Sequence, residues 1–188
     1  MWHHADIKVL PDKVHRHACL SPDKLALTEG RLRLTFGEID TASNRIAHAV
    51  ARERGASGSV VGFVGKNSAS FFEILFGVGK AGCTLLPLNW RLAALEIAPI
   101  VDDALPALIF VDKEFVPLLE AVLKTAAHQC KLVVFDPTAA DSGLAAWCGD
   151  APAQQIDFAD ALPISPTGKI LKRALRDAFW QGQWRTVG

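Results

Sequence analysis

Val60-Val61-Gly62-Phe63-Val64 is the stretch that decides the fold, together with the helical pattern and the apolar run Thr84-Leu85-Leu86-Pro87-Leu88 that follow it. A short apolar run bounded by turn residues is typical of a strand that is buried on both faces. Ser68 can cap a helix between the two runs, in which apolar residues recur from Phe71 to Val78. Strand, helix and strand in short succession predict two parallel strands joined by a helical crossover.

The same alternation continues along the chain. The sequence predicts a helix over 93–103, a strand over 107–111, a helix over 114–124 and a strand over 131–135. Apolar strands that alternate with helices specify a parallel sheet that is covered on both faces. The fold class is therefore α/β, with a partial, mostly parallel sheet and helices on both faces.

A hairpin and a long helix precede this alternation. Short apolar runs on either side of Gly30 predict an N-terminal hairpin over 25–36. Thr35 and Glu38 have the spacing of a capping box, and apolar residues then recur at helical spacing over 39–50. The sequence therefore predicts an amphipathic helix directly after the hairpin.

Length and charge limit the classes of protein that fit. The chain has 188 residues, half of them apolar, and a formal net charge of zero, which allows one good core. Residues 169–188 carry five Lys or Arg against one Asp, but no zinc-finger, RRM or helix-turn-helix signature accompanies them, so we expect no nucleic-acid partner. No signal peptide is visible, and Glu73 and Lys80 interrupt the longest apolar region, so we expect no transmembrane segment.

The cysteines and histidines are the next candidates for chemistry. The chain contains Cys19, Cys83, Cys130 and Cys148. Their wide spacing without a C-x-x-C pair indicates reduced thiols in a cytoplasmic protein. His15, His17 and Cys19 would share one face of a strand and suggest a metal site. A fourth ligand is not apparent, so we expect surface histidines and no metal.

Glycine-containing stretches invite a phosphate-binding interpretation, and each fails on spacing or placement. Residues 65–68 and 168–170 lack the first glycine of a P-loop, and neither Lys66 nor Lys169 is followed by Ser or Thr. Residues 77–82 spell G-x-G-x-x-G, but after a helix and before a strand, which reverses the dinucleotide-binding order. We expect this motif to serve close helix packing or a helix C-cap.

A stiff turn near the C-terminus presents one cation. Residues 162–169, Leu-Pro-Ile-Ser-Pro-Thr-Gly-Lys, place Lys169 after two prolines at the start of a predicted C-terminal helix. This helix is amphipathic and needs a partner surface. Its apolar stripe consists of Ile170, Leu171, Ala174, Leu175, Ala178 and Phe179. Taken alone, the turn also fits ordinary turn and cap residues with a solvated lysine.

The segment between Asp136 and this turn has no clear period. It contains no Lys or Arg, and its aspartates are scattered among Ala, Pro and Gly. Such a stretch in a compact domain indicates a functional loop, a linker or a misread element.

Two blocks of the sequence resemble two parts of one protein family and occur in the same order as in that family. The first consists of 22–28, 34–40, 43–47, 60–68, 80–83, 87–92 and 106–111, and the second of 162–176. The first resembles the opening of the large N-terminal domain of the AMP-forming acyl-CoA synthetases, the adenylate-forming ligases that activate fatty and other carboxylic acids. The second is similar to the closing motif of their small C-terminal domain.

This resemblance implies site residues and cofactors. It implies that Lys169 is catalytic and bridges the substrate carboxylate and the phosphate region of ATP, with Thr167 and Gly168 in cofactor binding. A positioned ammonium offsets the repulsion between two anions and the charge that develops at the α-phosphate. ATP, CoA and Mg are the implied cofactors, and a fatty or other carboxylic acid is the implied substrate.

The chain also departs from the family. In the family the Ser/Thr/Gly-rich phosphate loop, the acyl tunnel, the ribose-binding aspartate and the hinge lie between the two blocks, and this sequence contains none of them. We therefore expect an internal deletion joined near 160–162. Residues 1–160 are then a partial N-terminal domain, and 161–188 are a remnant of the C-terminal domain. We expect ATP, CoA and Mg to bind poorly and the chain to be inactive as a ligase.

A partial sheet also predicts an exposed edge. The unpaired strand and the apolar patch beside it offer a surface for association, where Leu171, Leu175 and Phe179 can dock. The alternative function is a non-enzymatic α/β module that pairs with an intact synthetase. An independent nucleotide-binding domain is disfavoured by the failed glycine spacings.

Overall fold

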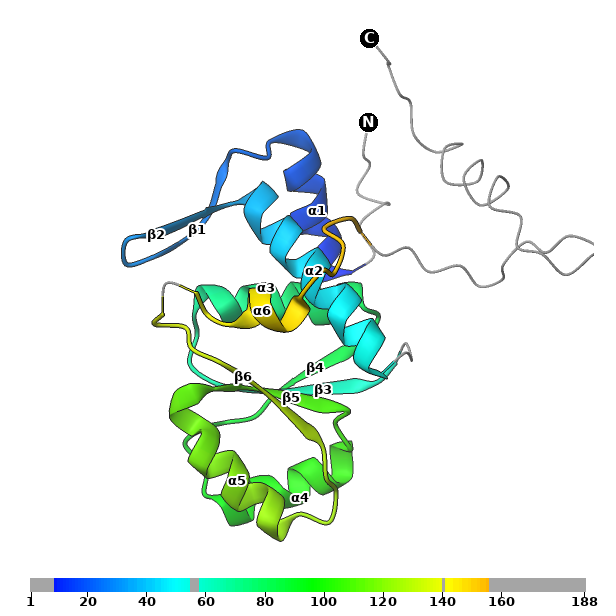
Figure 1. The fold of residues 1–188 in the computed structure, drawn as a ribbon, viewed down its shortest axis with the longest axis vertical. Helices are drawn as coiled ribbons and strands as arrows, with labels where there is room; N and C mark the ends of the chain where they lie inside the picture. Colours follow the sequence, from blue (N-terminus) through cyan, green and yellow to red (C-terminus); the bar gives the residue numbers. More distant parts are fainter. Residues whose placement is uncertain (1–8, 55–57, 140, 156–188) are drawn as a thin grey trace, which may run out of the picture. The chain divides into compact units, whose positions relative to one another are not determined.

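The computed structural model describes residues 9–54, 58–139 and 141–155, and Figure 1 shows the elements that they form. The predicted C-terminal helix and the predicted join near 160–162 lie outside the described residues.

A parallel sheet of four strands forms the centre of the described chain. The strands are β3 (Val60–Val64), β4 (Thr84–Pro87), β5 (Leu108–Asp112) and β6 (Lys131–Phe135), in the order β4-β3-β5-β6. The predicted α/β class is confirmed, and so are the predicted strands, whose bounds differ by no more than one residue. From β3 the chain first adds β4 on one side and then β5 and β6 on the other, so the strand order reverses at β3.

Helices cover both faces of the sheet, as predicted (Figure 1). One face carries α2 (Phe36–Arg54) and α3 (Ala69–Lys80), and the other carries α4 (Ala94–Ala104) and α5 (Val116–Thr125). A 3-10 turn, Lys113–Phe115, precedes α5 within the segment predicted as one helix. It forms because the Asp112 carboxylate accepts a hydrogen bond from the Glu114 backbone N–H (3.1 Å).

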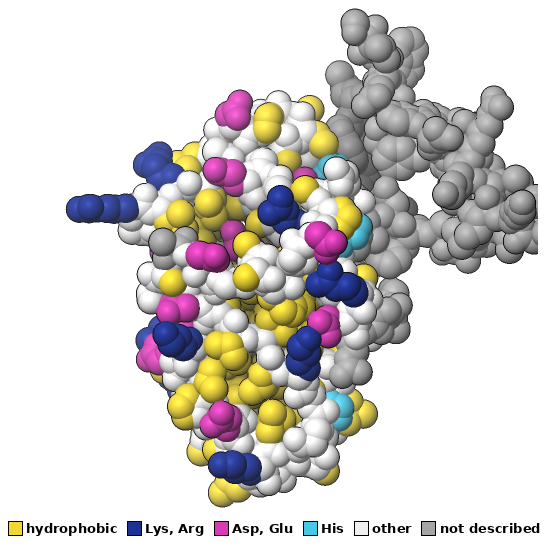
Figure 2. Space-filling model, in the orientation of Figure 1, with side chains coloured by type: hydrophobic (Ala, Val, Ile, Leu, Met, Phe, Trp, Pro, Cys, Tyr) yellow, Lys and Arg dark blue, Asp and Glu magenta, His cyan; other side chains and the backbone are white. Residues whose placement is uncertain are grey.

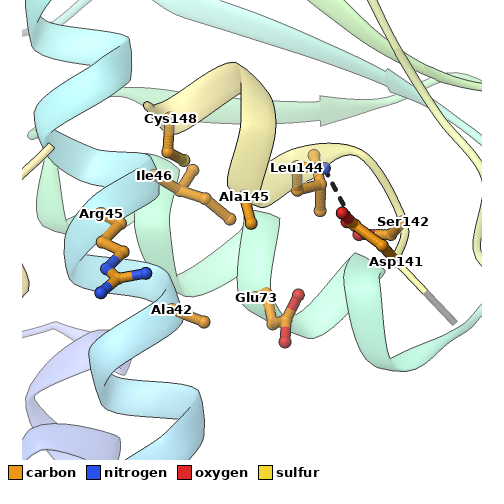
Figure 3. A pocket seen from close by; sticks show the side chains of 9 residues that line it. All are labelled: Ala42, Arg45, Ile46, Glu73, Asp141, Ser142, Leu144, Ala145 and Cys148. Atoms are coloured by element: carbon orange, nitrogen blue, oxygen red, sulfur yellow. Dashed lines mark hydrogen bonds between the residues drawn. The ribbon is translucent and has the colours of Figure 1, made fainter. Parts of the chain in front are cut away.

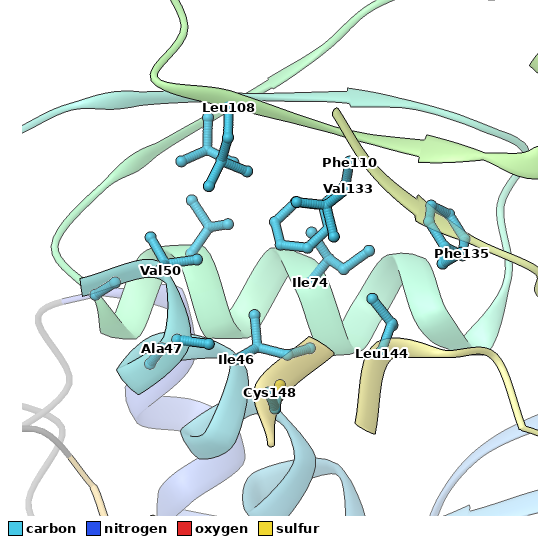
Figure 4. Close-up of a cluster of buried hydrophobic side chains, with 14 of the residues drawn as sticks. Ile46, Ala47, Val50, Ile74, Leu108, Phe110, Val133, Phe135, Leu144 and Cys148 are labelled. Carbon is cyan, nitrogen blue, oxygen red and sulfur yellow. The ribbon is translucent and has the colours of Figure 1, made fainter. Parts of the chain in front are cut away.

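Strand β5 divides the core into two halves. All of its residues are buried, and side chains along a strand alternate between the two faces. Leu108 and Phe110 pack with Ile74 and other residues of the α2 and α3 side, which Figure 4 shows. Ile109 and Val111 pack with residues of α4 and α5. Burial on both faces explains why the strand is continuously apolar in sequence.

The predicted hairpin is confirmed. Strand β1 (Leu25–Glu29) pairs antiparallel with β2 (Leu32–Thr35), and Gly30 takes a φ of +57° in the turn. The capping box is confirmed as well. The Thr35 backbone N–H donates to the Glu38 carboxylate (2.8 Å), and the Glu38 backbone N–H donates to the Thr35 hydroxyl (3.2 Å).

The structure corrects the prediction for the first described segment. Leu10–Leu20 forms helix α1, so the strand spacing that placed His15, His17 and Cys19 on one face does not apply. His17 is exposed, as expected. The His15 side chain is only 23% exposed, and its Nδ1 lies 3.2 Å from the Asp40 carboxylate.

A second correction concerns the segment without a clear period. Leu144–Cys148 forms a short helix, α6, in which both terminal side chains are buried in the core beside α2. A helix of five residues is too short to produce a periodic signal in sequence. Its apolar residues form a helix here because they pack against a surface that the earlier elements provide.

The G-x-G-x-x-G motif serves helix packing, as expected. A Cβ placed on Gly77 would lie 2.5 Å from Cγ2 of Ile46, so α2 and α3 approach closely only because this position has no side chain. Gly82, just beyond α3, has a φ of +68°, a left-handed conformation typical of the residue that follows a helix.

The strand order leaves β4 and β6 at the edges of the described sheet. On β6, Val134 is 47% exposed. On the face of the molecule that Figure 2 shows, apolar side chains lie over the middle, among acidic and basic ones. Association through this edge stays a prediction. None of the helices formed by the described residues is long and apolar enough to cross a bilayer.

Candidate functional site

The predicted site residues Lys169, Thr167 and Gly168 lie outside the described residues, so their roles stay predictions. The described residues form a different candidate site, a hollow of about 560 Å³ that we call the carboxyl-end hollow. Residues that follow β3, β5 and β6 line it. Ligands of open α/β sheets bind outside the carboxyl ends of the strands, where the strand order reverses.

The lysines in the carboxyl-end hollow are paired with carboxylates. The Lys66 ammonium lies 2.6 Å from the Glu114 carboxylate, and the Lys113 ammonium lies 3.6 Å from Asp136. Asp112 accepts the Glu114 backbone hydrogen bond described above. Both lysines in the hollow therefore have a carboxylate beside them.

The two aspartates of the hollow have opposite pKa shifts. Burial raises the pKa of Asp112, against the hydrogen bond from the Glu114 backbone. Hydrogen bonds from the side chain and the backbone of Thr138, at 2.7 and 3.0 Å, lower the pKa of Asp136. Asp136 therefore stays an anion beside Lys113 over a wide pH range.

The N-terminus of α3 opens into the same hollow, and protein groups fill it. Ser68 accepts a hydrogen bond from the Phe71 backbone N–H (3.2 Å), which confirms the predicted cap. The Glu29 carboxylate accepts the Ala69 backbone N–H (2.7 Å). A helix N-terminus can bind a phosphate, but here a carboxylate of the hairpin takes that place. Residues 65–68 lack the spacing of a P-loop, and in the structure a carboxylate lies where a phosphate would bind.

Aromatic and cationic side chains lie near Lys66, one of the residues that line the hollow. Trp90 stacks on Phe115 with ring centroids 5.1 Å apart, and the Arg91 guanidinium lies 4.1 Å from the centroid of the Trp90 ring. Lys66 lies 5.6 Å from the same ring, and it lines a second hollow with Trp90 and Arg91. This arrangement suits a planar or weakly anionic group better than a chain of phosphates, because the Lys66 charge is already paired with Glu114.

A buried polar cluster lies away from the hollow, between α2 and α3. The Lys80 ammonium donates to the carboxylate of Asp40 (2.6 Å), to the Ser43 hydroxyl (2.8 Å) and to the Asn44 side-chain oxygen (2.8 Å). Its side chain is 4% exposed. Burial lowers the pKa of Lys80, and the Asp40 carboxylate opposes that shift.

Glu73 lines a smaller hollow of about 240 Å³ beside α6. Figure 3 shows Glu73 on α3 and Arg45 on α2 on either side of it, with Leu144 and Ala145 from α6. Burial raises the pKa of Glu73 to about 7. Among the residues that the structure describes, no group of three His, Cys, Asp or Glu side chains could hold a metal ion.

Sequence reasoning did not find the partners of Lys80 or Glu29. Both contacts join residues that lie 40 positions apart in the chain, so no local pattern encodes them. One signal was present for Lys80: it interrupts the longest apolar region of the sequence, and a charged side chain is rarely buried without a partner.

Comparisons with known proteins agree on one family. The sequence profile described as "AMP-binding enzyme" matches residues 14–169. The fatty acid–[acyl-carrier-protein] ligase ScoC of Streptomyces coeruleorubidus is 41% identical over 119 residues, which are 63% of this chain and 23% of the ligase. The indoleacetate–CoA ligase of Aromatoleum aromaticum is 32% identical over 127 residues, which are 68% of this chain and 25% of that protein.

A solved structure supports the same conclusion about the fold. The crystal structure of a Rhodopseudomonas palustris protein described as a long-chain-fatty-acid CoA ligase superposes with a TM-score of 0.69 at 25% identity. The superposition covers 81% of this chain and 39% of that one. The chain thus spans about a quarter of the length of the two curated relatives.

Proposed function

Because the chain belongs to the family of AMP-binding enzymes, we propose that it derives from an acyl-CoA ligase. Such a ligase activates a fatty or other carboxylic acid with ATP as an acyl-adenylate and then forms a thioester with CoA. In this proposal residues 1–160 are part of the large domain and 161–188 a remnant of the small one. The ligases for fatty acid and indoleacetate named above support a carboxylic acid as the substrate class.

The proposal extends to the activity of the 188-residue chain, which we expect to form no acyl-adenylate. One observation carries this expectation: the Glu29 carboxylate occupies the N-terminus of α3 at the carboxyl-end hollow. The sequence also contains no Ser/Thr/Gly-rich phosphate loop to supply other donors. Oriented donors of that kind supply most of the transition-state stabilisation in adenylation, and one lysine cannot replace them.

Lys169, with Thr167 and Gly168 before it, keeps its place in the proposal as the remnant of the adenylation lysine. Its ammonium would neutralise two approaching anions if a site held them. The described residues do not fit the phosphates of ATP or CoA, because carboxylates pair with the lysines of the hollow. We therefore expect ATP, CoA and Mg to bind poorly to this chain.

We propose a cytoplasmic location. In the described part of the chain, which includes every cysteine of the sequence, no cysteine forms a disulfide. Thiols that stay reduced are typical of proteins in a reducing compartment.

Carboxylate-dependent exchange between ATP and pyrophosphate tests the activity. The purified 188-residue chain and its Lys169→Ala variant are assayed with a series of fatty and aromatic acids, beside an intact acid–CoA ligase as positive control. We expect both forms of the chain to stay at the background rate. Circular dichroism on the same samples establishes that they are folded. Exchange by the unaltered chain about tenfold or more above the Lys169→Ala variant would overturn the proposal.

A further inference from the structure

Helix α1 brings a thiol and an imidazole together. Cys19 and His15 lie four residues apart on α1, and the Cys19 Sγ is 3.5 Å from the His15 Nε2. On the other side of the same ring, the Nδ1 lies 3.2 Å from the Asp40 carboxylate on α2. The order thiol, imidazole, carboxylate is that of a nucleophile, its base and the group that orients the base.

The hydrogen bonds determine where the protons lie. An ionised carboxylate only accepts hydrogen bonds, so the His15 Nδ1 carries a hydrogen and donates to Asp40. When the ring is neutral, its Nε2 is then an acceptor that faces the Cys19 S–H. Burial works to raise the pKa of Asp40, but hydrogen bonds from His15 and Lys80 lower it overall. Asp40 therefore remains the anion that this arrangement requires.

We propose that Cys19 is a covalent modification site, at which the His15 imidazole removes the thiol proton and the sulfur forms a mixed disulfide with a small-molecule disulfide. Cys19 is exposed, whereas Cys148 is buried and Cys83 and Cys130 are half-buried. The site is separate from the carboxyl-end hollow and does not depend on ligase activity.

The reaction balances without a further oxidant. The Cys19 S–H proton goes to the His15 Nε2 as the sulfur attacks one sulfur of the disulfide. A new sulfur–sulfur bond forms at Cys19, the bond within the reagent breaks, and the departing thiolate takes the proton from the imidazolium. Cys19 is oxidised to the mixed disulfide, and half of the reagent is reduced to a thiol.

A base is needed because the Cys19 thiol by itself ionises poorly near neutral pH. Burial and the nearby Asp40 charge raise the pKa of Cys19, so the thiol is protonated near neutral pH. A thiol of this kind reacts through a base that takes the proton during the attack. The imidazole at 3.5 Å is placed for that role.

The surroundings favour a disulfide over a carbonyl compound as the reagent. Acyl transfer to a thiol requires donors for an oxyanion. Cys19 lies in the last turn of α1, where backbone N–H groups are directed to preceding carbonyls, as in the bond from Ser21 to the His17 carbonyl (2.8 Å). Thiol–disulfide exchange requires only a thiolate and access to it.

The experiment measures mixed-disulfide formation at each cysteine of the full chain with oxidised glutathione, resolved by peptide mass spectrometry. His15→Asn keeps a donor near the position of Nδ1 for Asp40 and removes the base. His17→Asn is the matched control, since that imidazole lies on the same helix but stacks on Phe36, with centroids 4.6 Å apart. Asp40 is not altered, because the change would leave Lys80 buried without its carboxylate.

We expect His15→Asn to slow the reaction at Cys19 by about tenfold or more, and His17→Asn to leave it unchanged. Equal rates in the unaltered chain and a folded His15→Asn variant overturn the proposal. A second measurement needs no variant: the unaltered chain is compared in its folded state and in urea. Cys19 should react faster when folded, since only the fold brings the base to it. A rate equal to or below that of the unfolded chain also overturns the proposal.

Discussion

Two ion pairs with the same separation lie in opposite environments. Lys80 and Asp40 join α2 to α3 with a nitrogen–oxygen distance of 2.6 Å and side chains that are 4% and 12% exposed. Lys66 and Glu114 at the carboxyl-end hollow also lie 2.6 Å apart, but their side chains are 51% and 57% exposed. Distance alone therefore does not tell which pair stabilises the fold. Burial decides that, because water and salt screen the exposed pair and hardly reach the buried one.

The buried pair is also the more completely hydrogen-bonded one. Besides the Asp40 carboxylate, Lys80 donates to the Asp40 backbone carbonyl (3.2 Å) and to side chains of Ser43 and Asn44. Desolvation of a charge is expensive, and such bonds offset much of it. Removing one partner then leaves the other charge buried, whereas removing a partner of the exposed pair leaves a solvated charge.

The largest expected effect follows from Lys80→Met. We expect a loss of about 3 kcal/mol or more in the free energy of unfolding, because Asp40 is left as a buried carboxylate without its ammonium partner. Urea denaturation followed by circular dichroism measures this change. Adding Asp40→Asn should recover part of the loss, since the uncompensated charge is then removed.

Lys124→Met is the control for this prediction. Lys124 also lies in the last turn of its helix, α5, but its side chain is exposed. The control therefore removes a helix-end charge without opening a buried pair. Losses that agree within about 0.5 kcal/mol for the two variants would show that burial of the Lys80 pair contributes nothing.

The contrast also explains which parts of the molecule the sequence could predict. Strands β3 and β5 were predicted within one residue because they are buried on both faces and form continuous apolar runs in the sequence. The cap at Ser68 and the capping box at Thr35 were predicted because both contacts span three residues. Local chemistry sufficed for all of these elements.

Features that depend on distant partners were not predicted. Helix α6 forms where Leu144 and Cys148 meet the core, and its own sequence has too few residues to show a period. The base at His15 was overlooked because it depends on Asp40, 25 positions away, and on the helical spacing of His15 and Cys19 in α1. The carboxyl-end hollow collects residues from several strand ends, which only the sheet order brings together.

Glu73 differs from the carboxylates of both ion pairs. It is half-buried, and the described structure gives it no hydrogen bond or ion pair. Its pKa is raised by burial from 4.5 to about 7, so the folded state disfavours the ionised form. The contribution of Glu73 to stability is therefore greatest below about pH 4.5 and is lost as the pH rises through about 7. In Glu73→Gln this contribution is absent. We expect the variant to gain stability relative to the unaltered chain between these pH values.

Urea denaturation across this pH range measures the difference between the two chains. Glu120→Gln is the control, since it removes a carboxylate from an exposed position on α5. If the free energies of unfolding of Glu73→Gln and the unaltered chain differ by the same amount at low and at neutral pH, the assignment of the raised pKa to Glu73 is contradicted.

The smallest expected effect is that of Lys66→Met at the exposed pair. We expect the free energy of unfolding to change by less than about 0.5 kcal/mol, because both side chains of the pair are exposed and Glu114 stays solvated. The change should shrink further when the salt concentration rises from 0.01 to about 1 M, since the Debye length falls from about 30 to about 3 Å. A loss approaching that of Lys80→Met, or one that is insensitive to salt, would mean that exposure does not separate the two pairs. Equal distances would then imply equal contributions, and Lys66 would belong to the framework of the fold together with Lys80.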